Sequence, residues 1–196
     1  MGETPIDDRE LRNLMTLYQR ADPAALEELV RRISPPLLRY FAWSGPWSSN
    51  GWSQAGRNDT EDLLQDCWIR IHRARHTYRS TEPVMPWIYA IARHTRLDAY
   101  RKRRRLESRE VLVATLPERF HQTVPDTDRE PDAFERLVAS LPESQREVIV
   151  MLKVSGMSLE EVANATSSTV GAVKQKAHRA YATLRRALGK DRENAG

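Results

Sequence analysis

The C-terminal part of the sequence contains a run of basic side chains without a single acid. Residues 168–190 include six Lys or Arg and no Asp or Glu. On a helical wheel of about 100° per residue, Gln175 and Arg179 lie opposite an apolar stripe that includes Val173 and Ala177. Gln and Arg side chains pair with base edges in the major groove, and Lys or Arg pairs with phosphates. The pattern predicts a helix that binds duplex DNA, although a solvated basic helix would have a similar composition.

A second basic stretch lies near the middle of the chain. Residues 86–109 contain eight Lys or Arg against two acids, Asp98 and Glu107. Four aromatic residues accompany them: Tyr78, Trp87, Tyr89 and Tyr100. Cations that hold a backbone, beside rings that stack on unpaired bases, suit single-stranded DNA. Both alternatives stay open, because a charge run is more commonly a solvated helix end and Trp87 on an apolar stripe is more commonly a core residue.

The basic C-terminal helix is preceded by the parts of a helix-turn-helix. We expect one helix to open after Pro142 and to end at Gly156. Residues 158–161 form a capping box for a short helix, and residues 165–168 supply a turn with a new N-cap. A long helix should follow from Thr169 to about Leu188. Two helices joined by a tight turn, with a third in support, define this motif.

The N-terminal half also has helical periodicity. Apolar residues recur at spacings of three and four within residues 11–18, and Asp22 followed by Pro23 is an N-cap signal for a second helix. Further helices are expected from near Asp59 and over residues 86–105, with a loop at residues 44–58. Because no segment alternates apolar and polar residues convincingly, the fold class is predicted to be all-α.

An acidic segment separates the two halves. Residues 110–143 contain eight acids, three bases and several prolines. We predict a flexible linker there, which divides the chain into two small helical domains. The expected boundaries are residues 1–106, a linker at 107–133, a second domain at 134–190 and a tail at 191–196.

Composition narrows the class of protein further. The chain has 196 residues, 31 Lys or Arg, 27 Asp or Glu, a formal charge of +4 and one cysteine. A lone cysteine excludes a disulfide scaffold. No apolar run approaches the roughly 20 residues of a membrane span, and the N-terminus lacks the pattern of a signal peptide. We therefore expect a soluble cytoplasmic protein without membrane insertion.

Catalytic and cofactor motifs are not apparent in the sequence. We find no phosphate-binding loop, nucleophile elbow or dinucleotide fingerprint. His72 and His76 could share a metal at their spacing of four, but no further ligand is evident. Cys67 lies among Leu64, Trp68 and Ile71 and should be buried and inert. We expect no catalytic residue, no metal, no cofactor and no small-molecule substrate.

Several short motifs resemble regions 2 and 4 of bacterial RNA polymerase sigma factors. The motifs similar to region 2 are DLLQD at residues 62–66, PWIYAIAR at 86–93 and LDAYR at 97–101. Those similar to region 4 are LPESQREV at residues 141–148 and GAVKQKAHRA at 171–180. Their order, with no other region present, resembles the small extracytoplasmic-function (ECF) class. The resemblance covers roughly residues 24–43, 59–105 and 134–188.

This resemblance implies partners and residue roles. In the family, the DLLQD helix docks on the β′ clamp helices of core RNA polymerase, which implies contacts from Asp62, Leu63, Gln65, Asp66 and Arg70. Asp62 could instead only help to cap its helix. Flipped bases of the promoter −10 element are captured by the following loop and helix, and extrusion of a base costs a few kcal/mol. That role implies the set Tyr78, Arg79, Trp87, Arg93, His94, Arg96 and Arg101.

Region 4 of the family reads the −35 element as duplex DNA, near the polymerase β flap. The residues implied are Thr169, Ala172, Lys174, Gln175, Lys176, His178 and Arg179. The family linker threads the polymerase cleft, which suits the acidic segment, and an anti-sigma factor is a further candidate partner. The function implied is promoter recognition with −10 strand opening. The rivals are a helix-turn-helix regulator that acts without polymerase, and a recombinase or nuclease, for which no nucleophile or acidic metal site is apparent.

Overall fold

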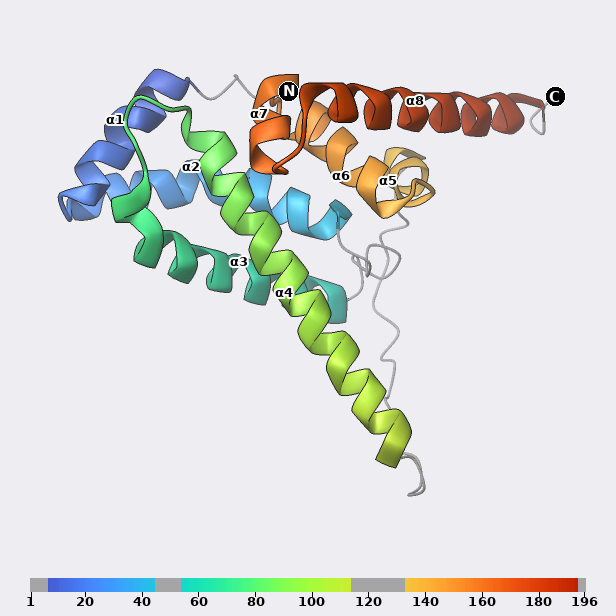
Figure 1. Cartoon of the computed structure of the whole chain (residues 1–196), viewed down its shortest axis with the longest axis horizontal. Helices are drawn as coiled ribbons and strands as arrows, with labels where there is room; N and C mark the ends of the chain where they lie inside the picture. The colour runs from blue at the N-terminus through green and yellow to red at the C-terminus, as the bar shows by residue number, and fades with distance from the viewer. Residues whose placement is uncertain (1–6, 45–53, 114–132, 194–196) are drawn as a thin grey trace.

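The computed structural model describes residues 7–44, 54–113 and 133–193, and within these residues the protein is helical, without strands (Figure 1). The helices, in chain order, are α1 (Asp8–Gln19), α2 (Pro23–Ser44), α3 (Gln54–Ala74), α4 (Val84–Val113), α5 (Ala133–Ala139), α6 (Glu143–Ile149), α7 (Leu159–Ala165) and α8 (Val170–Glu193). A 3-10 turn at Arg75–Thr77 follows α3, and a π-helical turn at Val150–Val154 follows α6. The predicted all-α fold class is confirmed.

The first two helices begin at side-chain caps. Asp7 Oδ1 accepts a hydrogen bond from the Arg9 amide at 3.0 Å, and Asp22 Oδ1 accepts one from the Ala25 amide at 3.0 Å. The Asp22 cap was predicted from the sequence and is confirmed. The turn between α1 and α2 places Ala21 in the left-handed region, with φ of 65°.

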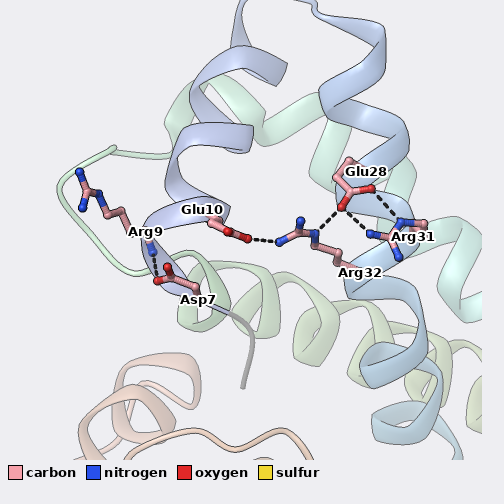
Figure 2. A network of polar contacts seen from close by, with 6 residues as sticks. All are labelled: Asp7, Arg9, Glu10, Glu28, Arg31 and Arg32. Carbon is pink, nitrogen blue, oxygen red and sulfur yellow. Dashed lines mark hydrogen bonds and ion pairs between the residues drawn. The ribbon is translucent and has the colours of Figure 1, made fainter. Parts of the chain in front are cut away.

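An exposed ion network joins α1 to α2 (Figure 2). Arg32 bridges Glu28 on its own helix and Glu10 on α1, while Arg31 pairs with Glu28 at 2.5 Å. Hydrogen bonds from Arg31 and Arg32 lower the pKa of Glu28 from 4.5 to about 2. Beneath this network the apolar faces of α1 to α4 form a common core that includes Leu11, Leu29, Ile33, Ile71 and Ile88.

Two predicted boundaries in the N-terminal half were wrong. α3 begins at Gln54, so residues 54–58 of the predicted loop are helical, and residues 45–53 lie outside the described residues. α4 continues to Val113, so residues 107–113 of the predicted linker are helical, and residues 114–132 also lie outside. Both segments contain good helix formers such as Gln, Ala, Arg, Leu and Glu, and these outweigh the glycine at position 56 and the local acidity.

The helix-turn-helix has the predicted elements. Gly156 ends the π-helical turn with φ of 67°, and Ser158 forms a capping box with Glu161 at the start of α7. The N-cap of the last helix lies one residue later than predicted, at Thr169. Its Oγ1 accepts a hydrogen bond from the Ala172 amide at 3.2 Å. The helix also ends later than predicted, at Glu193.

The two halves of the chain pack against each other. α7 lies against α4, and α6 with the π-helical turn lies against α2. Beyond this contact α4 and α8 run in different directions, and their C-terminal ends are far apart (Figure 1). The two basic helices therefore share one contact region but present separate surfaces.

Candidate nucleic-acid interface

The outer face of α8 is open along its first three turns. Lys174, Gln175, His178 and Arg179 are exposed, and in the part of the chain that the structure describes none of their side chains forms an ion pair or hydrogen bond. Thr169 caps the helix, and Ala172 and Lys176 are half-buried at the edge of this face. The predicted −35 residues therefore lie together on one surface.

The opposite face of α8 holds the helix in place. Val173 and Ala177 are buried against the core that includes Val162 of α7, and Ala180 is buried against Leu141 and Ile149. The wheel placed Val173 and Ala177 on the apolar stripe but missed Ala180. Its small side chain lets the adjoining helices approach closely.

Two predicted −10 residues pack against each other rather than lying open to solvent. The Tyr78 ring is 4% exposed and packs edge-on against Trp87, with ring centroids 5.6 Å apart. Its hydroxyl donates a hydrogen bond to the Glu82 carbonyl at 2.6 Å, and burial raises the pKa of Tyr78 to about 12. Trp87 is half-buried. The Tyr78 ring therefore lies inside the loop that leads into α4, against the first turn of that helix.

Arg96 contacts carboxylates of the other half of the molecule. Its side chain is 2% exposed, and its guanidinium pairs with Glu147 at 2.8 Å and with Glu143 at 2.7 Å. Arg93 also pairs with Glu147, at 3.3 Å. The expectation that Arg96 faces DNA does not hold in this arrangement, because α6 covers it. His94 and Arg101 remain exposed on α4, and Arg79 is exposed in the preceding loop.

Tyr40 of α2 completes this buried network. Its hydroxyl donates a hydrogen bond to Glu147 Oε1 at 2.9 Å, and burial raises its pKa well above the ordinary value. Burial alone would lower the pKa of Arg96, but the carboxylates of Glu147 and Glu143 reverse that effect, so the cation is retained. Sequence reasoning missed Glu147. In the sequence Glu147 is only a carboxylate four residues after Glu143, and nothing in the spacing links it to Arg96.

The DLLQD motif places three polar side chains on one exposed stripe of α3. Asp62, Gln65 and Asp66 are exposed, whereas Leu63 is 4% exposed and belongs to the core. Leu63 therefore supports the helix and does not offer a surface for a partner. Asp62 does not cap α3, because the helix begins at Gln54.

Arg70 lies beside this stripe and is tied to the next helix. It donates a hydrogen bond to Asp98 of α4 at 2.7 Å, and this bond lowers the pKa of Asp98. A groove of about 450 Å³ lies between α3 and α4 and is lined by Asp62, Asp66 and Lys102 among others. The stripe and the basic helix α4 are thus neighbouring walls of one groove.

The remaining candidate groups have local contacts. His72 Nδ1 shares a 2.8 Å hydrogen bond with the Tyr18 hydroxyl, and no group of three or more metal-ligating side chains occurs among the described residues. Cys67 is buried, as predicted, and burial raises its pKa to about 12. None of the described helices is long and apolar enough to cross a membrane.

Comparison with known proteins identifies the class. Residues 48–106 match Sigma-70 region 2, and residues 132–184 match Sigma-70, region 4. The chain is 32% identical over 181 residues to the ECF RNA polymerase sigma factor SigF of Caulobacter vibrioides, which covers 90% of this chain and 93% of that protein. It is 33% identical to SigD of Mycobacterium tuberculosis over 84% of this chain and 77% of that protein.

Two solved structures have the same fold. One is CnrH in complex with the cytosolic domain of CnrY, at a TM-score of 0.61 and 24% identity, covering 94% of this chain and 98% of that one. The other is the sigma factor RpoE in complex with the anti-sigma factor NepR from Bartonella quintana, at a TM-score of 0.64 and 20% identity, covering 84% and 96%. The chain belongs to the ECF RNA polymerase sigma factors. It is a transcription initiation factor, and the predicted family is confirmed.

Proposed function

We propose that this sigma factor binds core RNA polymerase through α3, reads −35 duplex DNA with α8, and opens −10 DNA with the loop before α4. It acts in the cytoplasm as a specificity subunit, without a catalytic site or cofactor of its own. Residues 1–106 and 134–190 are its two domains, and the segment that joins them, residues 107–133, begins with the last residues of α4. The observation that carries the proposal is the open polar face of α8 in a helix-turn-helix.

The α8 face suits duplex recognition without rearrangement. Gln175 and Arg179 are four residues apart, so both side chains can enter one stretch of major groove. Lys174 and Lys176 flank them and suit phosphate contacts. Thr169, Ala172 and His178 complete the surface at its near end and edge. Because these cations lack carboxylate partners in the described residues, no ion pair has to break when DNA binds.

The α3 stripe suits a protein partner. Asp62, Gln65 and Asp66 lie at i, i+3 and i+4, and none has a side-chain partner among the described residues. A stripe of this kind fits a basic helical surface such as the β′ clamp helices. Arg70 contributes through its bond to Asp98, which fixes α3 against α4.

The −10 surface is composed of exposed and enclosed parts. Arg79, His94 and Arg101 are exposed, and the pairs of Arg79 with Glu82 and of Arg101 with Asp98 lie at the surface. Arg93 and Arg96 are instead paired with the buried Glu147. We therefore assign first contact with DNA to the exposed set. Arg96 joins them only when α6 leaves, and the partner that moves α6 is core polymerase, with the C-terminal domain near its β flap.

An anti-sigma factor is the further partner that we propose. The two similar solved structures, CnrH and RpoE, are both complexes with a second protein, and for RpoE that protein is an anti-sigma factor. The exposed α3 stripe is the surface such a protein would need to cover in order to block polymerase binding.

The test is a double variant, Asp62→Ala with Asp66→Ala. We expect it to weaken co-elution with bacterial core RNA polymerase on gel filtration, because both carboxylates of the stripe are lost. Binding to −35 duplexes selected from a randomised pool should be unchanged. Glu27→Ala with Glu160→Ala is the matched control, since both are exposed acids away from the stripe. Equal loss of polymerase and duplex binding would contradict the role of α3, and no co-elution of the folded wild-type protein would favour a helix-turn-helix regulator.

A further inference from the structure

The loop between α3 and α4 is held in shape by α1, a helix distant in sequence. This loop comprises the 3-10 turn and residues 78–83, and it is the segment to which the proposed function assigns −10 recognition. Backbone groups at its start, middle and end are bonded to side chains of α1. The loop also has hydrogen bonds of its own, such as that from the Tyr78 hydroxyl to the Glu82 carbonyl, but the bonds to α1 fix how it is placed against the helices.

Gln19 fixes the first half of the loop. Its Nε2 donates hydrogen bonds to two carbonyls, those of Arg75 at 2.7 Å and Tyr78 at 2.9 Å. An amide nitrogen has two hydrogens, and both are used here. The two carbonyls belong to the turn that places Tyr78 inside the loop, where its ring packs against Trp87. Gln19 thereby sets the direction in which the chain leaves α3.

Asp8 and Arg12 fix the second half. Asp8 Oδ1 accepts a hydrogen bond from the Val84 amide at 3.0 Å, which makes it the cap of α4 from 76 residues away. Arg12 pairs with Asp8 at 2.5 Å and reaches the Thr81 carbonyl at 3.5 Å. The start of the basic helix is therefore anchored to the same helix that anchors the loop.

These three side chains form one stripe of α1. At about 100° per residue, Asp8, Arg12 and Gln19 fall within one narrow sector of the helix. The stripe lies outside the segment that matches Sigma-70 region 2, which begins at residue 48. Between the anchored ends the Arg79 side chain points outward and is 80% exposed.

We propose that Gln19 and Asp8 are positioning residues for −10 recognition, which hold the loop so that its outer side faces the unpaired strand. The inference rests on the proposed function, because it assigns a support to the loop that the function uses. Neither residue contacts DNA in this proposal. Their effect passes through the backbone of the loop.

The experiment uses the full-length chain with bacterial core RNA polymerase and a promoter library randomised at the −10 and −35 elements. Transcripts are sequenced to give the preference at each element. We expect Gln19→Ala to lower discrimination at the −10 element roughly tenfold, equivalent to about 1.4 kcal/mol, as the loss of two hydrogen bonds suggests. Preference at the −35 element should be unchanged, because α8 is untouched.

Three further variants separate positioning from general stability. Gln19→Lys keeps a donor near the carbonyls and should retain −10 discrimination. Gln19→Glu has the same shape without a donor and should lose at least as much as alanine. Asn13→Ala removes an exposed amide of α1 that forms no hydrogen bond to the described residues of the loop and should behave as wild type. Equal loss at both elements in Gln19→Ala would overturn the proposal, and so would unchanged −10 preference.

A second readout does not depend on transcription. Trypsin cleavage after Arg79, followed by mass spectrometry, should be several-fold faster in Gln19→Ala than in wild type or Asn13→Ala, because the freed loop enters the protease more readily. Unchanged cleavage would overturn the anchoring itself. If cleavage changes as expected but wild-type holoenzyme selects no −10 sequence, the proposed function fails while the anchoring stands.

Discussion

α4 and α8 carry the two basic surfaces of the molecule, and they differ in what their cations contact. On α8, Lys174 and Arg179 have no carboxylate partner among the described residues. On α4, Arg93 and Arg96 are paired with Glu147 of α6, and Arg96 is buried. The sequence around each helix has a similar excess of positive charge, so the difference arises only in the folded arrangement.

Together with the proposed function, this difference predicts an order of events in promoter recognition. The surface of α8 is complete as it stands and can meet duplex DNA at once. Part of the α4 surface becomes available only after the two halves of the chain separate. A partial separation is unfavourable, because an arginine that loses its carboxylate partner while it is still buried gains no water in exchange.

The largest expected effect comes from removing the carboxylate that holds Arg96. Glu147→Ala leaves a buried cation without its main partner, so the free energy of unfolding should fall by about 3–5 kcal/mol in urea titrations. If the halves part to let Arg96 reach water, the radius of gyration measured by X-ray scattering should rise as well. Either response would show that the contact between the halves depends on this pair.

Glu143→Ala is the matched control on the same helix. Its side chain is 45% exposed and also pairs with Arg96. A half-exposed ion pair contributes about 1 kcal/mol or less, so this variant should unfold close to wild type. Equal destabilisation by the two variants would mean that burial does not distinguish them, and the contrast between α4 and α8 would lose its basis.

On α8 the corresponding substitution should change DNA binding and leave stability unaltered. Arg179→Ala removes an exposed guanidinium and should weaken binding to a selected −35 duplex by about 1–3 kcal/mol, with relaxed preference at one base pair. Its midpoint of unfolding should match wild type. Lys153→Ala, an exposed cation of the π-helical turn, is the control. If both variants weakened DNA binding equally, the contribution of Arg179 would not be specific to its position on α8.

The fold could be predicted largely because its signals are local. Asp22 and Pro23 at the start of α2, Gly156, and the capping box at Ser158 each act within a few residues, so the sequence alone locates them. The errors fell on helix ends, at Gln54 and Val113, where good helix formers carry a helix into segments with loop-like composition.

The site was only partly predictable, because several of its determinants are contacts between distant segments. The outer face of α8 follows from periodicity and was located correctly. The burial of Leu63, Tyr78 and Arg96 depends on which helices pack together, and no spacing in the sequence encodes the bond between Arg96 and Glu147. For the same reason the link from Gln19 to the loop before α4 was not predicted.

A substitution at Gly156, in the turn before α7, tests how firmly the helix-turn-helix that carries the α8 surface is held. Gly156 has φ of 67° and no atom within 4 Å of an added Cβ, so Gly156→Ala adds backbone strain alone. We expect a loss of about 1–2 kcal/mol in the free energy of unfolding. Gly171→Ala, inside α8 with only an ordinary contact at 3.9 Å, should be neutral or stabilising. Equal losses would indicate that the turn does not require its left-handed conformation.

The smallest effect is expected at Glu28, which like Glu147 pairs with two arginines but has a side chain that is 28% exposed, against 8% for Glu147. Its pKa falls from 4.5 to about 2 in the folded protein, mainly through the hydrogen bond from Arg31. A lowered pKa means that the stabilisation is present above the unfolded value and disappears as pH falls through the folded value. The difference in melting temperature between wild type and Glu28→Gln should therefore be small at pH 7, fade between pH 4.5 and about 2, and shrink with added salt. A difference as large as that of Glu147→Ala would show that pairing alone, without burial, explains the strength of the contact at Arg96.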